Sequence, residues 1–348
     1  MDTEYLFKIH YKSHGKPNRP DLKNEKAKCH WCQLRAFSTS KTFPVAIVND
    51  VDNDFIPRDF VFIENCEPGK GIELTDPEFC VGCECTEHDT CKSDECSCLQ
   101  DMTVLDETDE EKYVYESKGG KDTLRADYLD TREPIYECHD KCYCGEDCPN
   151  RVVERGRKIT LQIFRTEDNR GWGTFLHSSF ACYQANVYVC IGVRSKEYIS
   201  KGQFVDKYVG EIITAEETER RRQLSDVAQK KDVYLFELDK FKDDADRDPS
   251  LADTVFVDGE FRSGPTRFIN HSCDPNLRIF ARVGPHALKR FHDLAFFAVK
   301  NIPAGTELTF DYVDGEDEKL EEEKRDRRKK KEMTKCLCGS DNCRGYLW

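Results

Sequence analysis

Short apolar runs alternate with polar segments along the second half of the chain, and they predict β-strands. A helix is predicted from Glu216 to about Lys230, because Thr214 and Glu217 form a capping box ahead of a run of helix-forming residues. Many short strands with few helices indicate a mainly β, irregular fold. The predicted strands are Ile159–Phe164, Phe204–Tyr208, Val233–Leu238, Leu294–Val299 and Glu307–Phe310.

The 348 residues suffice for one large domain with satellites or for two domains. We find neither an apolar run of membrane-spanning length nor a secretory signal, so we expect a soluble intracellular protein without a membrane partner. The net charge of −14 argues against a nucleic-acid clamp and suits a basic partner. The basic run Lys324–Lys331 follows an acidic one, which is typical of a solvated linker; nuclear import or DNA contact is the alternative.

Cysteines are the most unusual part of the composition, with nineteen in the chain. In a reducing compartment this number favours metal binding over disulfides, whereas a secreted disulfide-bonded protein is the alternative. A Cys-rich module spans residues 80–148, and an acidic, loop-like stretch from about Asp101 to Asp130 divides it. Nine of its cysteines, from Cys83 to Cys148, form the set considered below, and Cys80 is left out.

Three C-terminal segments belong together: Asn270-His271-Ser272-Cys273, Glu307 to Tyr312 (ELTFDY), and Cys336-Leu337-Cys338 followed by Cys343. With the nine-cysteine module ahead of them, they resemble the SET-domain protein lysine methyltransferases. The most similar branch is the Su(var)3-9-like histone H3 lysine-nine group of fungal type, which has pre-SET and post-SET zinc motifs. The resemblance runs from about Pro44 to Trp348.

This resemblance implies a SET β-fold, in which the NHSC and FDY segments meet at a knot-like crossing. It implies the following organisation: an N-terminal arm (1–43), a pre-SET region with a zinc cluster (44–157), a SET domain (158–315), a charged linker (316–331) and a post-SET tail (332–348). The expected activity is methyl transfer from S-adenosylmethionine to lysine nine of the histone H3 tail. We expect this activity in heterochromatin, in the nucleus and on the chromosome.

Nine thiolates are an awkward number for separate four-ligand zinc sites, but they fill the twelve positions of three zinc ions if three of them bridge two metals. The triangular three-zinc cluster of the family has this arrangement, and its role is structural. A fourth zinc is expected in the post-SET site, held by Cys273, Cys336, Cys338 and Cys343. The pre-SET ligands are Cys83, Cys85, Cys91, Cys96, Cys98, Cys138, Cys142, Cys144 and Cys148.

Matching of motifs also assigns the methyl-transfer site. Tyr312 corresponds to the catalytic tyrosine of the family and Tyr208 to the second tyrosine of the lysine channel, although a buried tyrosine bonded to backbone is the simpler interpretation of each. Asp239 is a candidate contact for an arginine beside the target lysine. The cofactor-binding candidates are Arg170, Gly171, Trp172, Tyr234, Arg267, Asn270, His271 and Trp348.

Phe310 is the position that indicates how many methyl groups the product carries. In the family a tyrosine here binds a water that limits methylation, and phenylalanine has no hydroxyl for that water. We therefore predict a trimethylated product.

One segment departs from the family pattern. Gly171-Trp172-Gly173 is followed by nineteen residues, Thr174–Gly192, that are rich in apolar and aromatic side chains, before the match resumes at Val193. Three explanations are open: an intron retained in the gene model, a lid over the cofactor, or a disabling insertion. The functional alternatives to the histone enzyme are a catalytically silent zinc-containing chromatin scaffold and a methyltransferase of a non-histone protein.

Overall fold

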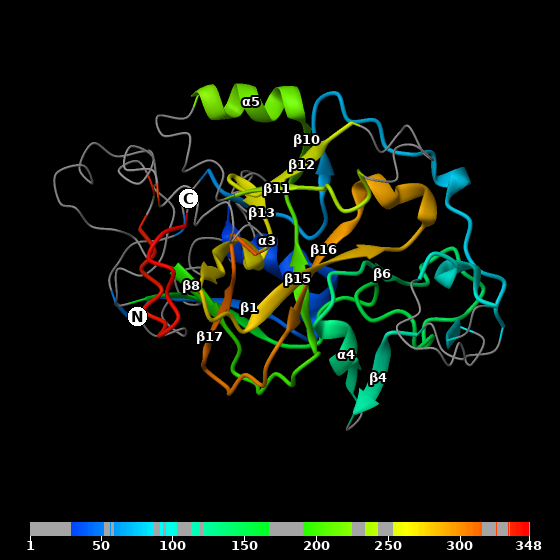
Figure 1. The fold of residues 1–348 in the computed structure, drawn as a ribbon, viewed down its shortest axis with the longest axis horizontal. Coiled ribbons are helices and arrows are strands. Elements are labelled where there is room, and N and C mark those ends of the chain that lie inside the picture. The colour runs from blue at the N-terminus through cyan, green and yellow to red at the C-terminus, as the bar shows by residue number, and fades with distance from the viewer. Residues whose placement is uncertain are drawn as a thin grey trace, which may run out of the picture.

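The structure is a computed structural model that describes residues 29–51, 56, 59–86, 91–92, 95–102, 113–118, 121–166, 191–224, 234–242, 253–314, 325, 333 and 335–347. Strands predominate in these parts of the chain, as the apolar pattern predicted. The α-helices are short apart from α5, which lies across one side of the molecule (Figure 1). They are α3 (His30–Ala36), α4 (Ala126–Leu129) and α5 (Ala215–Leu224).

The largest sheet joins strands that are far apart in the sequence. Two short strands extend it: β14 (Asn270–His271) pairs with β17, and β6 (Ile135–Tyr136) pairs with β15. The central path runs in the order β1 (Val45–Val48), β7 (Leu161–Arg165), β8 (Ile191–Arg194), β17 (Glu307–Phe310), β15 (Leu277–Val283), β16 (Asp293–Ala298) and β9 (Phe204–Tyr208).

Smaller sheets and 3₁₀ turns surround this sheet. One sheet has the order β11 (Leu235–Glu237), β12 (Val255–Asp258), β10 (Glu211–Thr214) and β3 (Glu67–Pro68). Two-stranded pairs are formed by β13 (Arg262–Ser263) with β2 (Val61–Phe62) and by β4 (Tyr115–Lys118) with β5 (Lys121–Leu124). The 3₁₀ turns are η1 (Ser38–Lys41), η2 (Pro77–Phe79), η4 (Ser97–Leu99), η8 (Pro265–Phe268) and η9 (His286–Phe291).

Helix α5 begins at Ala215, directly after the predicted cap Thr214 and one residue before the predicted start at Glu216. The backbone N–H of Glu217 donates to Oγ1 of Thr214 at 3.2 Å, which satisfies one of the free donors of the first turn. Within α5 only Thr218 is buried. The described part of the helix ends at Leu224, short of the predicted end near Lys230, and residues 225–230 lie outside the described part of the chain.

Strand β16 separates two apolar cores. Leu294, Phe296 and Ala298 face the core of the main sheet, whereas Ala295 and Phe297 face a second core. This second core contains seven of the nine module cysteines, and the other two, Cys85 and Cys142, pack against it. Side chains along a strand alternate between its faces, so a strand with cores on both sides is apolar throughout. The cysteine-rich region is therefore packed directly onto the central sheet.

A buried chain of charged groups crosses the same boundary. The Glu137 carboxylate accepts from Tyr115, from three backbone N–H groups and from Nε of Arg282 at 2.9 Å. Arg282 reaches Asp293 at 3.1 Å, and Nζ of Lys207 lies 3.4 Å from the other oxygen of Asp293. Glu137 directly precedes Cys138, a zinc-ligand candidate, and Lys207 directly precedes Tyr208, a candidate tyrosine of the lysine channel, so these charged groups connect the two regions.

Candidate active site and metal centres

The two predicted C-terminal segments do meet. Strands β14 and β17 are parallel partners, with Asn270 opposite Thr309 and His271 opposite Phe310. The backbone N–H of Ser272 donates to the carbonyl of Phe310 at 3.0 Å, and that of Tyr312 donates to Nδ1 of His271 at 3.2 Å. The crossing therefore fixes the NHSC and FDY segments relative to each other.

Aromatic rings from three strands gather beside this crossing. The ring of Tyr208 lies 4.4 Å from that of Phe236, Phe236 lies 5.9 Å from Phe310, and Phe310 lies 4.6 Å from Tyr312, measured between centroids. All three predicted catalytic residues are thus in one cluster. Phe236 was not among the predicted residues, although its place two positions after Tyr234 on an alternating strand puts both on one face.

Both tyrosine hydroxyls donate to backbone carbonyls: Tyr208 to Tyr234 at 3.0 Å and Tyr312 to Ile269 at 2.7 Å. Burial raises the pKa of both phenols above its ordinary value. They therefore stay protonated at neutral pH. Gly259 packs against the Tyr208 hydroxyl so closely that any β-carbon there would collide with it.

The described cofactor candidates fall into two pairs. The Arg267 guanidinium stacks 4.1 Å from the ring centroid of Tyr234, beside the Tyr208 end of the cluster. Asn270 and His271 lie at the Tyr312 end, where the Asn270 amide donates to the carbonyl of Ile191 at 3.0 Å and to Glu307 at 2.7 Å. The remaining candidates, Arg170, Gly171, Trp172 and Trp348, lie outside the described residues.

His271 is neutral in this site. Burial, reinforced by the positive charge of Arg344, lowers its pKa to about 3. Its Nδ1 accepts the backbone N–H of Tyr312, so the ring proton is on Nε2, which lies 3.2 Å from Sγ of Cys273. The ring therefore connects the catalytic segment to a candidate metal ligand.

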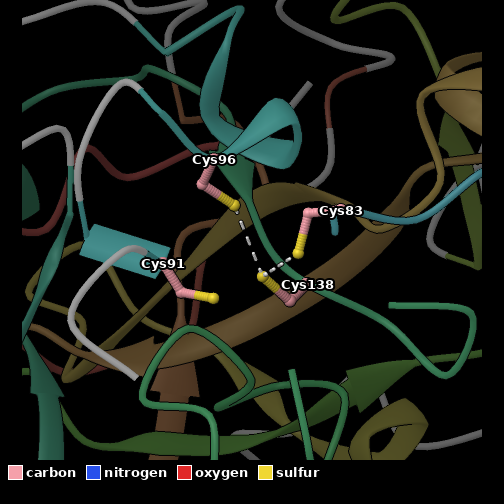
Figure 2. Close-up of side chains that lie close together, drawn as sticks. All are labelled: Cys83, Cys91, Cys96 and Cys138. Carbon is pink, nitrogen blue, oxygen red and sulfur yellow. Dashed lines mark hydrogen bonds between the residues drawn. The ribbon is translucent and has the colours of Figure 1, made fainter. Parts of the chain in front are cut away.

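The pre-SET sulfurs converge on a compact cluster, with Cys138 at its centre. Its Sγ lies 3.8 Å from those of Cys83 and Cys96, and Cys91 belongs to the same group (Figure 2). Two sulfurs that bind one zinc at about 2.3 Å in a tetrahedron are about 3.8 Å apart, and no disulfide joins the described cysteines, so the site fits zinc. The module cysteines in such groups are Cys83, Cys91, Cys96, Cys98, Cys138, Cys142, Cys144 and Cys148. Cys85 belongs to none of the groups but packs against the same core.

Hydrogen-bond donors surround these sulfurs, as the negative charge of a thiolate cluster requires. Backbone N–H groups of Cys83 and His139 donate to Sγ of Cys142 at 3.4 and 3.2 Å, and the Asn150 amide donates to Sγ of Cys138 at 3.5 Å. Such contacts stabilise thiolates and hold them in place.

In the tail, Sγ of Cys273 lies 3.8 Å from that of Cys336, and a ligand group is formed by His271, Cys273, Cys336 and Cys338. Cys343 is exposed and outside this group, but the backbone N–H of the next residue, Arg344, donates to Sγ of Cys273 at 3.4 Å. The three sulfurs of this group fit zinc, whereas both nitrogens of His271 are engaged, and the assignment of Cys343 as the fourth ligand stays a prediction.

Arg344 is a residue of this site that was not predicted. Its guanidinium pairs with Asp311, which stands between Phe310 and Tyr312. Asp311 lies within the recognised FDY segment, so an acidic residue in need of a basic partner was visible in the sequence. A search of the tail for a basic residue could have found Arg344. Asp239 is exposed just beyond β11, and its proposed role stays a prediction.

Only the end of the segment Thr174–Gly192, which departs from the family pattern, lies within the described residues. Its last two residues, Ile191 and Gly192, belong to β8 and pair with Arg165 and Phe164 of β7, whereas Thr174–Cys190 lie outside the described residues. Removing Thr174–Gly192 or removing Gly173–Ile191 gives the same sequence, because glycine stands at both junctions. In either product Trp172 and one glycine directly precede Val193, as Ile191 and Gly192 do here.

Comparisons with known proteins agree with this geometry. A model of the SET domain matches residues 191–313, and a model of the Pre-SET motif matches residues 37–151. The H3 lysine-9 specific histone-lysine N-methyltransferase dim-5 of Neurospora crassa is 50% identical over 355 residues, which cover 99% of this chain and 100% of that protein.

Two solved structures of SET-domain proteins align with this chain over most of its length. The structure of Neurospora DIM-5 aligns with a TM-score of 0.67, covering 78% of this chain and 95% of that one at 50% identity. Arabidopsis thaliana SUVH6 in complex with SAM aligns with a TM-score of 0.61 at 26% identity, covering 96% of this chain and 61% of that one. In the described residues, no helix combines the length and apolarity that a membrane span needs. The chain belongs to the SET-domain histone-lysine methyltransferase family, in the Su(var)3-9-like branch that carries a pre-SET motif.

Proposed function

We propose that this chain transfers methyl groups from S-adenosylmethionine to lysine nine of the histone H3 tail, reaches the trimethyl state, and acts in heterochromatin in the nucleus. The observation that carries the proposal is the cluster of Tyr208, Phe236, Phe310 and Tyr312 at the crossing of β14 and β17. Its support from relatives is the name of the Neurospora protein and the SAM complex of the Arabidopsis one.

The cluster suits a lysine side chain because aromatic walls surround a long apolar stem and exclude water from it. A free lysine has a pKa of about 10.4, so its amine must lose a proton before it acts as a nucleophile. Desolvation between the rings favours the neutral amine. The two tyrosines are protonated phenols and cannot take that proton, so water carries it away.

S-adenosylmethionine, when bound, supplies a methyl group on a positively charged sulfur. Asn270, His271, Arg267 and Tyr234 are the described residues proposed to hold it. Tyr208 and Tyr312 each donate their hydroxyl proton to a carbonyl, which leaves oxygen lone pairs to orient the amine and to contact a polarised methyl group. We propose four zinc ions, three in the pre-SET cluster and one in the tail.

Phe310 supports the trimethyl product. Its buried ring packs 5.0 Å from Phe296 and 4.6 Å from Tyr312, and it offers no hydroxyl to hold a water beside the amine. Phe310→Tyr is expected to shift products from trimethyl to mono- and dimethyl lysine. A variant that still makes mainly trimethyl lysine would contradict this role.

The test of the function is transfer from labelled S-adenosylmethionine to an H3 tail peptide, with products identified by mass spectrometry. Two proteins are compared: this chain and the chain without Thr174–Gly192. Activity of both would make the segment a tolerated loop, and activity of the shorter form alone would make it an artefact or an inhibitor. Absence of activity in both, with full zinc content, would favour a silent scaffold or a non-histone substrate.

A further inference from the structure

An exposed apolar surface lies on the cysteine-rich region, away from the aromatic cluster. Three side chains form it: Phe79 is 70% exposed, Val81 is 78% exposed and Tyr143 is 75% exposed. Soluble proteins seldom leave large apolar side chains grouped in this way unless they bind something. None of the three belongs to the metal-ligand groups or the lysine channel.

Backbone contacts hold these residues next to one another. The N–H of Val81 donates to the carbonyl of Phe79 at 3.0 Å, and the N–H of Tyr143 donates to the carbonyl of Cys83 at 2.9 Å. Between them Gly82 packs against the backbone of Lys141 and Cys142, where a β-carbon would lie 2.5 Å from backbone atoms. The zinc-ligand segments thus form a firm base for the surface.

Carboxylates border this surface. Asp76, Glu78, Glu84 and Asp140 are exposed, whereas Lys141 is the exposed cation of the same segments. Burial and then the Asp140 carboxylate raise the pKa of the Cys80 thiol, Lys141 lowers it and Asp76 raises it, so these charged groups lie near Cys80. An apolar centre with an acidic border fits a partner of the opposite charge with its own apolar side chain.

The negative charge of this border distinguishes between a nucleic acid, a second copy of the chain and a basic polypeptide as the partner. Nucleic acid would be repelled by four carboxylates. A second copy of this chain would bring one acidic border against another in a protein of net charge −14. A basic polypeptide satisfies both the apolar centre and the border.

We infer that Phe79, Val81 and Tyr143, with their acidic border, bind a basic histone segment other than the tail that enters the lysine channel. This inference rests on the proposed function, since it makes the surface a second contact with the same substrate. In Figure 1 the cyan part of the chain, near residues 80–100, lies at the edge opposite the C-terminal end. A short tail peptide in the channel would leave that surface unoccupied.

The test compares Phe79→Ser/Val81→Ser with a matched control, Leu224→Ser, which replaces a 71% exposed side chain at the end of α5. Binding is measured by fluorescence anisotropy with labelled H3–H4 tetramer whose tails have been removed. We expect the double variant to bind about tenfold more weakly, as loss of two apolar anchors predicts, and the control to bind like the parent. Equal binding by all three proteins, or no binding by the parent, would overturn the inference.

A second variant addresses the border without touching apolar side chains. Asp76→Asn/Glu78→Gln/Glu84→Gln retains the turn, because Asn can accept the Glu78 N–H that Asp76 accepts at 3.0 Å. Its binding to the same tetramer is expected to be weaker and less sensitive to salt than that of the parent. An unchanged salt dependence would exclude the acidic border as a binding element.

Methyl transfer separates this inference from the proposed function. On the H3 tail peptide the Phe79→Ser/Val81→Ser variant is expected to match the parent, whereas on intact H3–H4 its kcat/KM is expected to fall by about tenfold. A parent that binds tailless tetramer but methylates no peptide would refute the proposed function alone. A parent that methylates the peptide but ignores tailless tetramer would refute the surface alone.

Discussion

The pre-SET cluster and the tail site use the same thiolate chemistry in opposite structural settings. Most pre-SET sulfurs are buried and form a core with side chains of β15 and β16, and the buried Glu137–Arg282–Asp293 chain ties this region to the sheet. The tail site lies partly in solvent and contacts the catalytic segment through His271 and the Arg344–Asp311 pair. We therefore expect that metal would support the fold at the first site, whereas at the second it would hold the tail against the candidate catalytic segment.

The largest effect expected from this difference is at Cys138, which belongs to all three groups of four cysteine sulfurs found in the described residues. Cys138→Ser should release zinc and unfold the pre-SET region, because zinc binding contributes on the order of 10 kcal/mol to such modules. Zinc per chain by mass spectrometry and thermal melting by circular dichroism measure this. Cys80→Ser, outside all groups, is the control, and a stable, zinc-loaded Cys138→Ser protein would show that the cluster is dispensable.

Breaking the Glu137–Arg282–Asp293 chain of ion pairs should lower the free energy of unfolding by less than the loss of zinc does. Arg282→Met leaves the fully buried Glu137 carboxylate without its cationic partner, and such a loss typically costs about 3–5 kcal/mol. Urea unfolding measures the change. The control, Arg278→Met, loses a half-buried pair with Asp314 and should cost about 1 kcal/mol or less; similar losses in the two variants would mean that the buried chain has no special role.

A smaller and local effect is expected in the tail. Arg344→Ala removes the pair with Asp311, so the tail should close less often, and we expect the KM for S-adenosylmethionine to rise about tenfold, or ~1.4 kcal/mol. Melting temperature and zinc content should stay near those of the parent. Arg344→Lys keeps the charge without the planar fork and should give an intermediate KM. A fall in kcat with unchanged KM would instead assign Arg344 to the chemical step.

The smallest effect is expected at a site with no metal. Hydrogen bonds from Arg220 and Arg221 lower the pKa of Glu217 to about 2. The resulting stability is present above the unfolded pKa of about 4.3 and is lost as the pH falls through the folded pKa. Because the group is solvated, the contribution should be under about 1 kcal/mol and should shrink in high salt. A carboxyl titration by NMR near pH 4 would contradict the pairing.

Local patterns predicted much of this structure. Strands β9 and β17 have the predicted bounds, and the capping box gave the start of α5. The cluster of module cysteines and the meeting of NHSC with FDY followed from motifs, since those residue types have few other uses in that order. Such features depend on neighbouring residues or on a recognised set.

Long-range partners could not be predicted in this way. Glu137 and Arg282 are separated by 145 positions, and nothing in their local sequence marks either as buried. Strand β15 (Leu277–Val283) was not among the predicted strands, and two arginines interrupt its apolar residues. In the structure Arg282 donates to Asp293, and Arg278 donates to the carbonyl of Leu129. Burial of a charge becomes visible only when its partner is known.

The position of β17 has a consequence for synthesis of the protein. This strand lies near the middle of the main sheet, between β8 and β15, yet its residues, Glu307–Phe310, follow those of the other strands of that sheet in the sequence. The earlier strands must therefore wait with open edges until β17 has been made, and such edges favour aggregation. Prompt release and chaperone protection should matter more for the yield of this protein than for one whose sheet grows in sequence order.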